Sequence, residues 1–418
     1  MVKKYYDVIV VGGGASGIAA AIGAAKTGAS CLLLERYGCL GGQATTANVA
    51  SYCGFFTHEE KPRQIVRGVG EEVLEELYSL GYYDGYKISP VGNAVVALDQ
   101  EATKFALDEV ISRYPVDVLL HCRMIHTETD TESGHVRQIL CVDDQDSYEF
   151  SAGAFVDATG DGNLAYLAGA QMRYGDGKGK GQASTRVMIM DRVPSEVQLK
   201  PDLLEKVFIQ AKKDGYRNLT KESGIVFRIN EDTVCAILPS IWIPDLRAET
   251  LTQCEMNTRK QAQEYLDVFH RYVPGMEHCR LITTGAQLGI RDTRHVVGEK
   301  ILTGEQVIHA MKPEDSIARG AWPCEMHVDV NKIAKYIFVD HDDYYGIPMG
   351  CLKAKNWKNL WCAGRTISAD PVAFASVRVM GCGFATGQAA GVAAALYQNG
   401  QGSIGSVQQE LIRQGALI

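Results

Sequence analysis

The glycine pattern Gly12-x-Gly14-x-x-Gly17 constrains the fold of this chain more than any other feature of its sequence. It follows a short apolar run and precedes a stretch rich in alanine, after which a second apolar run comes. Consecutive parallel strands require a helical crossover between them, so this order predicts a βαβ unit. The expected elements are a strand at residues 6–11, a helix at 15–27 and a strand at 30–35.

Each glycine of this pattern has a physical role if the unit binds a dinucleotide. Gly12 permits a tight turn, Gly14 lets the backbone approach a pyrophosphate, and Gly17 allows close packing of helix on strand. The phosphates would then meet unpaired N–H groups at the positive end of the helix. Glu35 closes the second strand about 20 residues after Gly14, where a carboxylate can accept hydrogen bonds from both ribose hydroxyls. The sequence therefore predicts a dinucleotide site that disfavours a 2′-phosphate.

Composition excludes several other classes of protein. With 418 residues, of which 46% are hydrophobic and 22% charged, the chain has the balance of a globular protein of two or three domains. A net charge of −8 without a run of Lys or Arg predicts no nucleic-acid partner. The 12 cysteines form no CxxC pair, which predicts free thiols and no metal or iron–sulfur site.

The apolar run at residues 8–25 is similar to a leader or a short membrane span, but glycines interrupt its centre. We therefore expect a soluble, cytoplasmic protein that has no membrane partner. Its oligomeric state is not predicted.

The rest of the chain predicts an α/β protein with two interleaved domains. A charged, alternating segment at 125–150 has the pattern of a β-meander, and a glycine-rich stretch at 175–181 predicts a hinge or surface turn. Other expected elements are helices at 67–80, 99–113 and 379–397 and strands at 116–121, 154–158 and 359–363. We expect a Rossmann-like dinucleotide-binding domain, a parallel sheet with the β-meander, at 1–185 and 340–418, and an inserted α+β substrate or cap domain at 186–339.

Two further loops bear on the choice between NAD and FAD. After Glu35 the loop at residues 38–46 continues past the ribose, and its adjacent glycines Gly41 and Gly42 let the backbone press against a bulky, flat ligand. A second strand ends in the glycine turn at residues 157–162. A nicotinamide-dependent dehydrogenase needs neither loop, so FAD is the expected cofactor. An NAD(P)-dependent Rossmann dehydrogenase is the alternative.

A family resemblance rests on four motifs, which together span residues 8 to 395. They are GGGASG, ERYGCLGGQATT, DATGDG and NLWCAGRTISAD…RVMGCGFATGQAAG. The chain resembles the FAD-dependent oxidoreductases of the glutathione-reductase-like superfamily, most of all the branch related to fumarate reductases and succinate dehydrogenases. Residues 289–294 (GIRDTR) are similar to that branch's GxRxxR element, and residues 322–327 (WPCEMH) to its W-P-x-D-x-H element. Glu325 stands where that branch usually has aspartate, which leaves the role of this carboxylate open.

The resemblance implies which residues hold FAD. The first helix and Glu35 would bind the pyrophosphate and the adenosine ribose, Met124 would contact the adenine through its backbone, and the helix beginning near residue 379 would aim its dipole at flavin O2. The implied cofactor-binding residues are Gly12, Gly14, Ala15, Ser16, Gly17, Glu35, Arg36, Gly41, Gly42, Gln43, Thr45, Met124, Ala158, Thr159, Gly160, Asp161, Gly364, Arg365, Arg378, Gly381 and Cys382.

The implied activity is hydride transfer between a small organic substrate and flavin N5, by a dehydrogenase, an oxidase or a C=C reductase. His327 is the candidate for moving a proton, and Arg291 for orienting a substrate carboxylate or stabilising negative charge. A non-catalytic flavin-binding electron-transfer subunit is an alternative from another class.

Structural roles stay open for several of these side chains. His327 could be a satisfied core histidine. Four arginines could instead form structural ion pairs, and two cysteines near the expected flavin could be redox-active or simply buried. These residues are Arg291, Arg294, Arg365, Arg378, Cys39 and Cys53.

Overall fold

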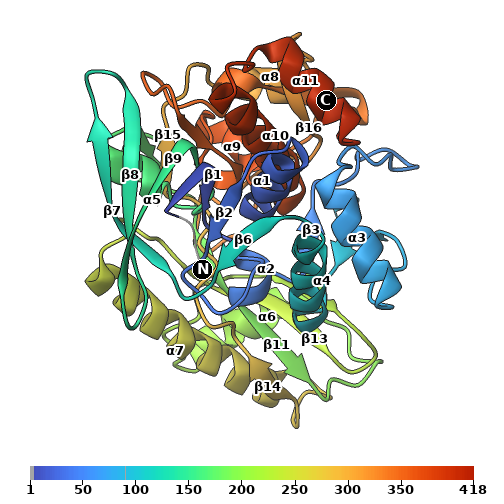
Figure 1. Ribbon diagram of the computed structural model, residues 1–418. Helices are drawn as coiled ribbons and strands as arrows, with labels where there is room; N and C mark the ends of the chain where they lie inside the picture. Colours follow the sequence, from blue (N-terminus) through green and yellow to red (C-terminus); the bar gives the residue numbers. More distant parts are fainter. Residues whose placement is uncertain (1–3, 90) are drawn as a thin grey trace.

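The structure is a computed structural model, and it describes residues 4–89 and 91–418. Its largest sheet has the strand order β6-β2-β1-β9-β8-β7, with β20 paired to β9 as well (Figure 1). The strands are β1 (Tyr5–Val11), β2 (Cys31–Leu34), β6 (Val116–Leu119), β7 (Arg123–Asp130), β8 (His135–Val142), β9 (Ser147–Asp157) and β20 (Leu360–Cys362).

Strand β9 joins the parallel core of this sheet to its antiparallel meander. The first half of β9 pairs antiparallel with β8, and its second half pairs parallel with β1 and β20. The sequence predicted the meander and the buried strand as separate elements, whereas they run together as one strand of 11 residues. The predicted α/β class, with a Rossmann-like parallel sheet and a meander, is confirmed.

The two faces of this sheet are covered differently. On one face Val8 and Val10 pack against helices, and on the other Ile9 and Val11 pack against the meander and α5 (Asn163–Ala168), as the alternation of side chains along a strand requires. The helices on the first face are α1 (Ala15–Lys26), α3 (Val69–Ser79), α4 (Gln100–Ser112), α10 (Met380–Gln398) and α11 (Ile404–Arg413).

A second, four-stranded sheet lies at the far end of the molecule from α10 and α11 (Figure 1). Its strand order is β12-β13-β11-β14, and helices α6 (Pro201–Lys213) and α7 (Ala248–Tyr272) pack on one of its faces through a separate core. The strands are β11 (Ser184–Asp191), β12 (Ile225–Arg228), β13 (Val234–Ile241) and β14 (Arg280–Thr283).

Short elements connect and flank the two sheets. The helices among them are α2 (Gln43–Thr46), α8 (Gly304–Ile308), α9 (Pro371–Val377) and the 3₁₀ turns η1 (Asp340–Asp342), η2 (Met349–Cys351) and η3 (Gly364–Thr366). The strands are β3 (Ser51–Cys53), β4 (Lys87–Ile88), β5 (Ala94–Ala97), β10 (Met172–Tyr174), β15 (Arg294–Val296), β16 (Ser316–Gly320), β17 (Cys324–Met326), β18 (Lys335–Ile337) and β19 (Tyr345–Pro348).

The division of the chain into 1–185 with 340–418 and 186–339 stays a prediction. The second sheet and its helices fall inside the predicted insertion, from β11 to β14. However, Leu302, Ile317 and Trp322 also belong to that stretch, and they pack in the same core as α1 and α10. The later part of the predicted insertion therefore lies against the dinucleotide-binding sheet's helices.

Among the described residues, no single helix has the length and apolar character to cross a membrane. Helices α9 and α10 have that length and apolar character only when they are taken together, and they are bent by 94° relative to each other.

Glycines let α1 and α10 cross in close contact. A Cβ atom added at Gly391 would lie 1.9 Å from the carbonyl oxygen of Ala20, and one at Gly387 would lie 2.1 Å from that of Ser16. Both contacts are with backbone, which cannot move aside as a side chain can. The spacing of the two helices therefore depends on these glycines.

We expect Gly391→Ala to destabilise the protein by about 1–3 kcal/mol, because overpacking a buried helix contact costs that much. The matched control is Gly405→Ala in α11, where an added Cβ meets nothing within 4 Å. That change should be neutral or stabilising by up to about 1 kcal/mol, the difference in helix propensity. Chemical denaturation measures both, and equal effects of the two substitutions would contradict this account of the crossing.

Candidate functional site

A cavity of about 1110 Å³ lies between the two sheets, and residues from both line it. It opens beyond the carboxyl ends of β1, β2 and β9, where Val11, Leu34 and Ala158 reach it. Ligands of open α/β sheets bind at this edge. Ligand pockets usually measure about 300–1,000 Å³, so this one has the volume for a large ligand.

The glycines of the first turn fall into two groups. Gly12 (φ +105°) and Gly17 are required by the protein itself, since added Cβ atoms would lie 2.4 Å from the Ala158 oxygen and 1.7 Å from the Gly12 oxygen. At Gly14, by contrast, the nearest atom to an added Cβ is 3.8 Å away, and at Gly383 in α10 it is 3.9 Å away. Both of these glycines line the cavity. The protein's own packing does not need them to be small, so this cradle fits a ligand that approaches the backbone.

Glu35 is held by the same turn. Its Oε2 accepts a hydrogen bond of 2.7 Å from the N–H of Gly13, and its Oε1 accepts one of 2.9 Å from that of Tyr37. A carboxylate has about four acceptor positions, so two remain for a ligand in the cavity that Glu35 lines. The geometry permits the ribose contact predicted from the sequence.

The glycine turn after β9 is organised by a buried carboxylate. Asp157 accepts hydrogen bonds from the N–H and the hydroxyl of Thr159 and from the N–H of Ala165. Burial raises the pKa of Asp157, against the effect of these hydrogen bonds. The turn that follows brings Thr159, Gly160 and Asp161 to the cavity.

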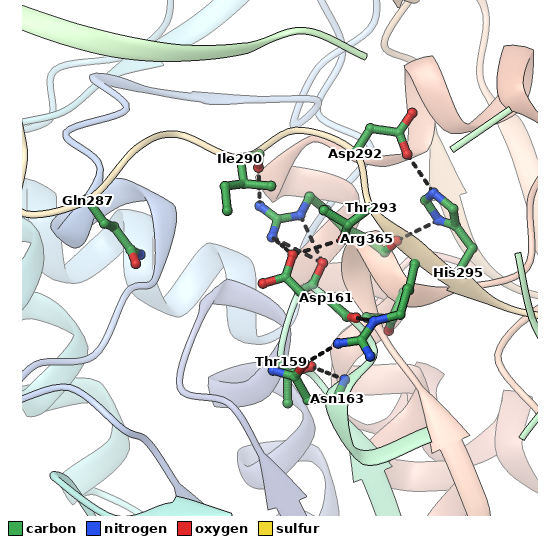
Figure 2. A network of polar contacts seen from close by, with 12 residues as sticks. Thr159, Asp161, Asn163, Gln287, Ile290, Asp292, Thr293, His295 and Arg365 are labelled. Atoms are coloured by element: carbon green, nitrogen blue, oxygen red, sulfur yellow. Dashed lines mark hydrogen bonds and ion pairs between the residues drawn. The ribbon is translucent and has the colours of Figure 1, made fainter. Parts of the chain in front are cut away.

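Arg365 connects this turn to the segment at residues 289–295 (Figure 2). Its guanidinium donates to the carbonyl oxygens of Gly160 and Ile290 and lies 3.6 Å from the carboxylate of Asp161. Burial lowers the pKa of Arg365. Arg365 therefore has a structural role, although it also lines the cavity.

Two buried side chains fix the segment at residues 289–295 from behind (Figure 2). Nε2 of His295 lies 2.7 Å from Asp292 Oδ1, and its Nδ1 lies 3.0 Å from the carbonyl oxygen of Arg365. The neighbouring Thr293 donates to Asp161, and Arg294 donates to the carbonyl oxygen of Asp161. Arg294 therefore links two loops rather than presenting a free charge to a substrate.

At another end of the cavity, Glu325 collects hydrogen bonds from three elements. Its carboxylate accepts from Trp322 Nε1 at 3.0 Å, from the Tyr336 hydroxyl at 3.1 Å and from Arg378 Nη2 at 3.3 Å. Nε2 of His327 lies 3.1 Å from its Oε1. A carboxylate surrounded by donors in this way is held in its ionised, acceptor-only form.

Arg291 lies beside this cluster and lines the cavity. Its Nη1 donates to the carbonyl oxygen of Ala183 at 2.7 Å and to the Thr185 hydroxyl. Nε of Arg378 is buried, and it has no hydrogen-bond partner among the described residues. Two guanidinium groups thus reach one part of the cavity with donor capacity to spare.

The charges of this cluster set its protonation states. Burial would raise the pKa of Glu325, but the hydrogen bond from His327 and the charges of Arg378 and Arg291 lower it well below its usual range. Burial, and then the charge of Arg291, lower the pKa of His327 to about 3. Burial and the charge of Arg378 lower the pKa of Arg291 to about 10. Near neutral pH the glutamate is therefore ionised, His327 is neutral and Arg291 is charged.

Comparison with protein families gives one match over nearly the whole chain. Residues 7–414 match the family model described as "FAD dependent oxidoreductase". This chain belongs to that family. The predicted FAD cofactor and the predicted class of enzyme, an FAD-dependent oxidoreductase, are thereby confirmed, and the alternative of an NAD(P)-dependent dehydrogenase is set aside.

Solved structures with the same fold include a monooxygenase and an aromatic hydroxylase. p-Nitrophenol 4-monooxygenase PnpA from Pseudomonas putida DLL-E4 is 9% identical, with a TM-score of 0.50 over 99% of this chain and 85% of that one. CabE, an aromatic hydroxylase from angucycline biosynthesis, is 12% identical, with a TM-score of 0.51 over 98% of this chain and 66% of that one. At such identities the likeness shows the fold alone. No curated protein sequence matches the chain significantly.

In this FAD-dependent oxidoreductase, nearly all the residues predicted to bind cofactor line the cavity. His327 and Arg291 line it as well. The predicted cofactor-binding residues that line the cavity are Gly12, Gly14, Ala15, Ser16, Glu35, Arg36, Gly41, Gly42, Gln43, Met124, Ala158, Thr159, Gly160, Asp161, Gly364, Arg365 and Arg378.

Four predicted cofactor-binding residues lie inside the protein instead. Gly17 packs on Gly12, and the hydroxyl of Thr45 donates to the carbonyl oxygen of Leu40 at 2.6 Å. Gly381 packs against the backbone of Cys53 and Gly54, and Cys382 is fully buried. Gly381 and Cys382 lie behind the cavity wall because the start of α10 turns Val379, Met380 and Gly383 to the cavity instead.

Three kinds of residue that line the cavity of this oxidoreductase were not predicted from the sequence. The first is Glu325, whose motif was recognised but whose role stayed open. Its hydrogen bond from Arg378 could not be predicted, because Arg378 is distant in the sequence. Tyr37 and Gln287 are joined by a hydrogen bond across the cavity. The third kind is apolar, from the second sheet: Val187, Phe227 and Ile237.

The thiol of Cys53 reaches the cavity but is not activated. Burial, followed by the charge of Glu325, raises the pKa of this thiol to about 12. Thiol chemistry needs the thiolate, so Cys53 is an ordinary protonated cysteine near neutral pH. The described residues contain no cluster of three or more His, Cys, Asp or Glu side chains that could hold a metal ion.

The lowered pKa of His327 predicts a pH dependence of stability. Between the pKa of His327 in the folded protein, about 3, and its unfolded value near 6.5, the unfolded chain binds more protons, so stability rises with pH in this window. The slope of the unfolding free energy against pH is proportional to the number of protons taken up on unfolding. We expect His327→Gln to lower that number by up to about one between pH 4 and 6. Denaturant titrations at several pH values measure this slope. His126→Gln on the exposed side of β7 is the control, and an unchanged slope in His327→Gln would contradict the assigned neutral state.

Proposed function

We propose that this oxidoreductase uses FAD bound in the cavity to move a hydride to or from a small organic substrate whose carboxylate is held by Arg291. When bound, FAD supplies the two-electron centre, flavin N5, that exchanges the hydride with substrate. The observation that carries the proposal is the convergence of Arg291, Arg378, Glu325 and His327 on one part of a cavity that also contains the dinucleotide turn.

The residues of the first turn would hold the pyrophosphate of FAD. Gly14 and Gly383 leave space that no protein atom occupies, and α1 begins at Gly14 without a side-chain cap. The unpaired N–H groups of its first turn can therefore donate to phosphate oxygens. Glu35 would accept hydrogen bonds from the adenosine ribose through its two remaining acceptor positions.

The resemblance to the branch related to fumarate reductases and succinate dehydrogenases supports the substrate end of the proposal. Its two elements, residues 289–294 and 322–327, come together at the cavity, where Arg291 and Glu325 both line the wall. Glutamate in place of the usual aspartate has a longer side chain, and here it meets Arg378, Tyr336 and Trp322.

Arg291 is suited to bind a carboxylate. Its Nη1 is held by Ala183 and Thr185, which fixes the plane of the guanidinium, and the group remains charged near neutral pH. A planar guanidinium matches the two oxygens of a carboxylate.

His327 is held as a neutral hydrogen-bonding side chain beside Glu325. Its pKa is lowered to about 3, so the ring is neutral, and with Glu325 ionised Nε2 carries the hydrogen and donates to that carboxylate. Nδ1 is then the acceptor. A ring with so low a pKa is a weak base, so the role of His327 in proton transfer stays a prediction.

The FAD site is tested with Gly14→Ala. Because an added Cβ at Gly14 meets no protein atom closer than 3.8 Å, the apoprotein should keep its stability to within about 0.5 kcal/mol. The dissociation constant for FAD should nevertheless increase at least about tenfold, since the methyl group would occupy ligand space. Flavin fluorescence titration gives the constant, and Gly405→Ala is the control. Unchanged FAD affinity in Gly14→Ala would place the pyrophosphate elsewhere.

The substrate site is tested by anaerobic mixing of the yellow holoenzyme with a panel of small carboxylic acids, with flavin bleaching as the readout. For any acid that reduces the flavin, we expect Arg291→Met to lower kcat/KM at least about 100-fold, or about 3 kcal/mol, because a charged hydrogen bond is lost. Arg291→Lys should recover part of this loss through charge. Arg137→Met, at an exposed arginine of β8, is the matched control.

Two outcomes would contradict the proposal. If Arg291→Met behaves like Arg137→Met, Arg291 does not hold the substrate. If small molecules never reduce the flavin but a protein partner does, the chain works as an electron-transfer subunit.

A further inference from the structure

We infer that the substrate is an amphipathic acid, a carboxylate with an aryl or branched alkyl body, and that this body lies against the second sheet. The inference rests on the proposed function for the position of the carboxylate. The apolar wall that carries it is an independent feature of the structure, formed by Val187, Ile237 and Phe227 of three neighbouring strands.

The strand register places these three side chains on one face of the sheet. Val187 of β11 pairs with Ile237 of β13, which in turn pairs with Ile225 of β12. Phe227 lies two residues beyond Ile225 and therefore on the same face. The opposite face carries Met188, Ala236 and Leu238, which are fully buried under α6 and α7. The sheet thus has apolar residues on both faces, which is typical of strands that are covered on both sides.

The protein covers the second face of this sheet only in part. Val187 packs with Ala50 in a small cluster, whereas Phe227 and Ile237 of the same cluster are only partly buried and border the cavity. Val49, Ala50 and Cys53 also line the cavity. Apolar side chains that face a cavity rather than solvent or core are the usual lining of a ligand pocket. A ligand with an apolar body would complete the burial of Phe227 and Ile237.

The polar and apolar parts of the cavity follow each other along one strand. Thr185 of β11 accepts a hydrogen bond from Arg291, and Val187 lies two residues further along the same strand. Two residues of a strand span about 7 Å, which is similar to the length from a carboxylate to the far side of a phenyl ring on a short linker. A carboxylate held by Arg291 therefore leaves the rest of an arylalkyl acid over Val187, Ile237 and Phe227.

The isoalloxazine ring of FAD is the other apolar body that this wall could contact, and the experiment separates the two. FAD-loaded protein is titrated with acetate, hexanoate, phenylacetate and 3-phenylpropanoate, and binding is followed by the perturbation of the flavin absorbance. We expect 3-phenylpropanoate to bind at least tenfold more tightly than acetate. In Phe227→Ala this preference should fall to less than threefold, with FAD affinity and acetate binding changed less than twofold.

Control variants keep the test independent of folding. Phe105→Ala removes the same atoms from an exposed position of α4 and should leave the preference unchanged. Ile237→Ala, on the neighbouring strand, is the second test of the wall if Phe227→Ala loses stability, and it should reduce the preference at least threefold. Thermal unfolding of each loaded protein accompanies the titrations.

Three results would overturn the inference. The first is equal affinity for acetate and 3-phenylpropanoate in the unchanged protein. The second is a Phe227→Ala variant that binds FAD at least tenfold more weakly but keeps the preference, since the flavin would then cover the wall. The third is the absence of any perturbation by carboxylates and by the uncharged analogue 3-phenylpropanamide.

A different result would overturn only the carboxylate clamp of the proposed function. If 3-phenylpropanamide binds in a manner that depends on Phe227 while every carboxylate fails to bind, the apolar wall is supported and the charged end is wrong.

Discussion

The buried pair of Asp292 and His295 is the interaction on which the rest of the site depends. The two side chains are 6% and 1% exposed, and both ring nitrogens of His295 face acceptors, the carboxylate of Asp292 and the carbonyl oxygen of Arg365. The ring therefore connects the segment at residues 289–295 to η3 from inside the protein. Leaving a buried donor or acceptor without its partner typically costs about 1–3 kcal/mol, so the loss of either side chain would weaken this contact. The segment at residues 289–295 is therefore fixed where it meets η3.

The same carboxylate is also connected, through Gln182, to the part of the cavity that contains His327. Asp292 Oδ2 accepts a hydrogen bond of 3.0 Å from the N–H of Gln182, and the side-chain oxygen of Gln182 accepts one of 3.0 Å from the N–H of His327. Through Arg365 the pair holds the glycine turn after β9, and through Gln182 it holds the strand that carries Glu325 and His327. The hydrogen bonds of one buried carboxylate thus hold the predicted cofactor loops and the candidate substrate side chains in fixed positions relative to each other.

The sequence predicted those parts of the site whose chemistry is local. The turn that begins at Gly12 and the carboxylate of Glu35 depend on spacing within one βαβ unit, and Gly12, Gly14 and Glu35 line the cavity. The direction in which Gly381 and Cys382 face could not be predicted, because it depends on how α10 packs against Gly54, which is distant in the chain. The apolar wall was missed for the same reason, since pairing of β11 with β13 and β12 decides which side chains of these strands face the cavity. The role of Glu325 needed Arg378, brought from the other end of the chain.

The crossing of α1 and α10 brings the N-termini of both glycine-rich helices to the cavity. Because Gly387 and Gly391 let the two helices touch along their backbones, the helices begin side by side, with Gly383 close to Ala15 and Ser16. Both helices start at the cavity without a side-chain cap, so the unpaired N–H groups of both first turns lie at its edge. Each helix N-terminus carries a partial positive charge, and two such ends together favour an anion more strongly than one. The close packing of two helices therefore adds to the positive electrostatics at the cavity, which suits a phosphate-bearing cofactor in a chain whose net charge is −8.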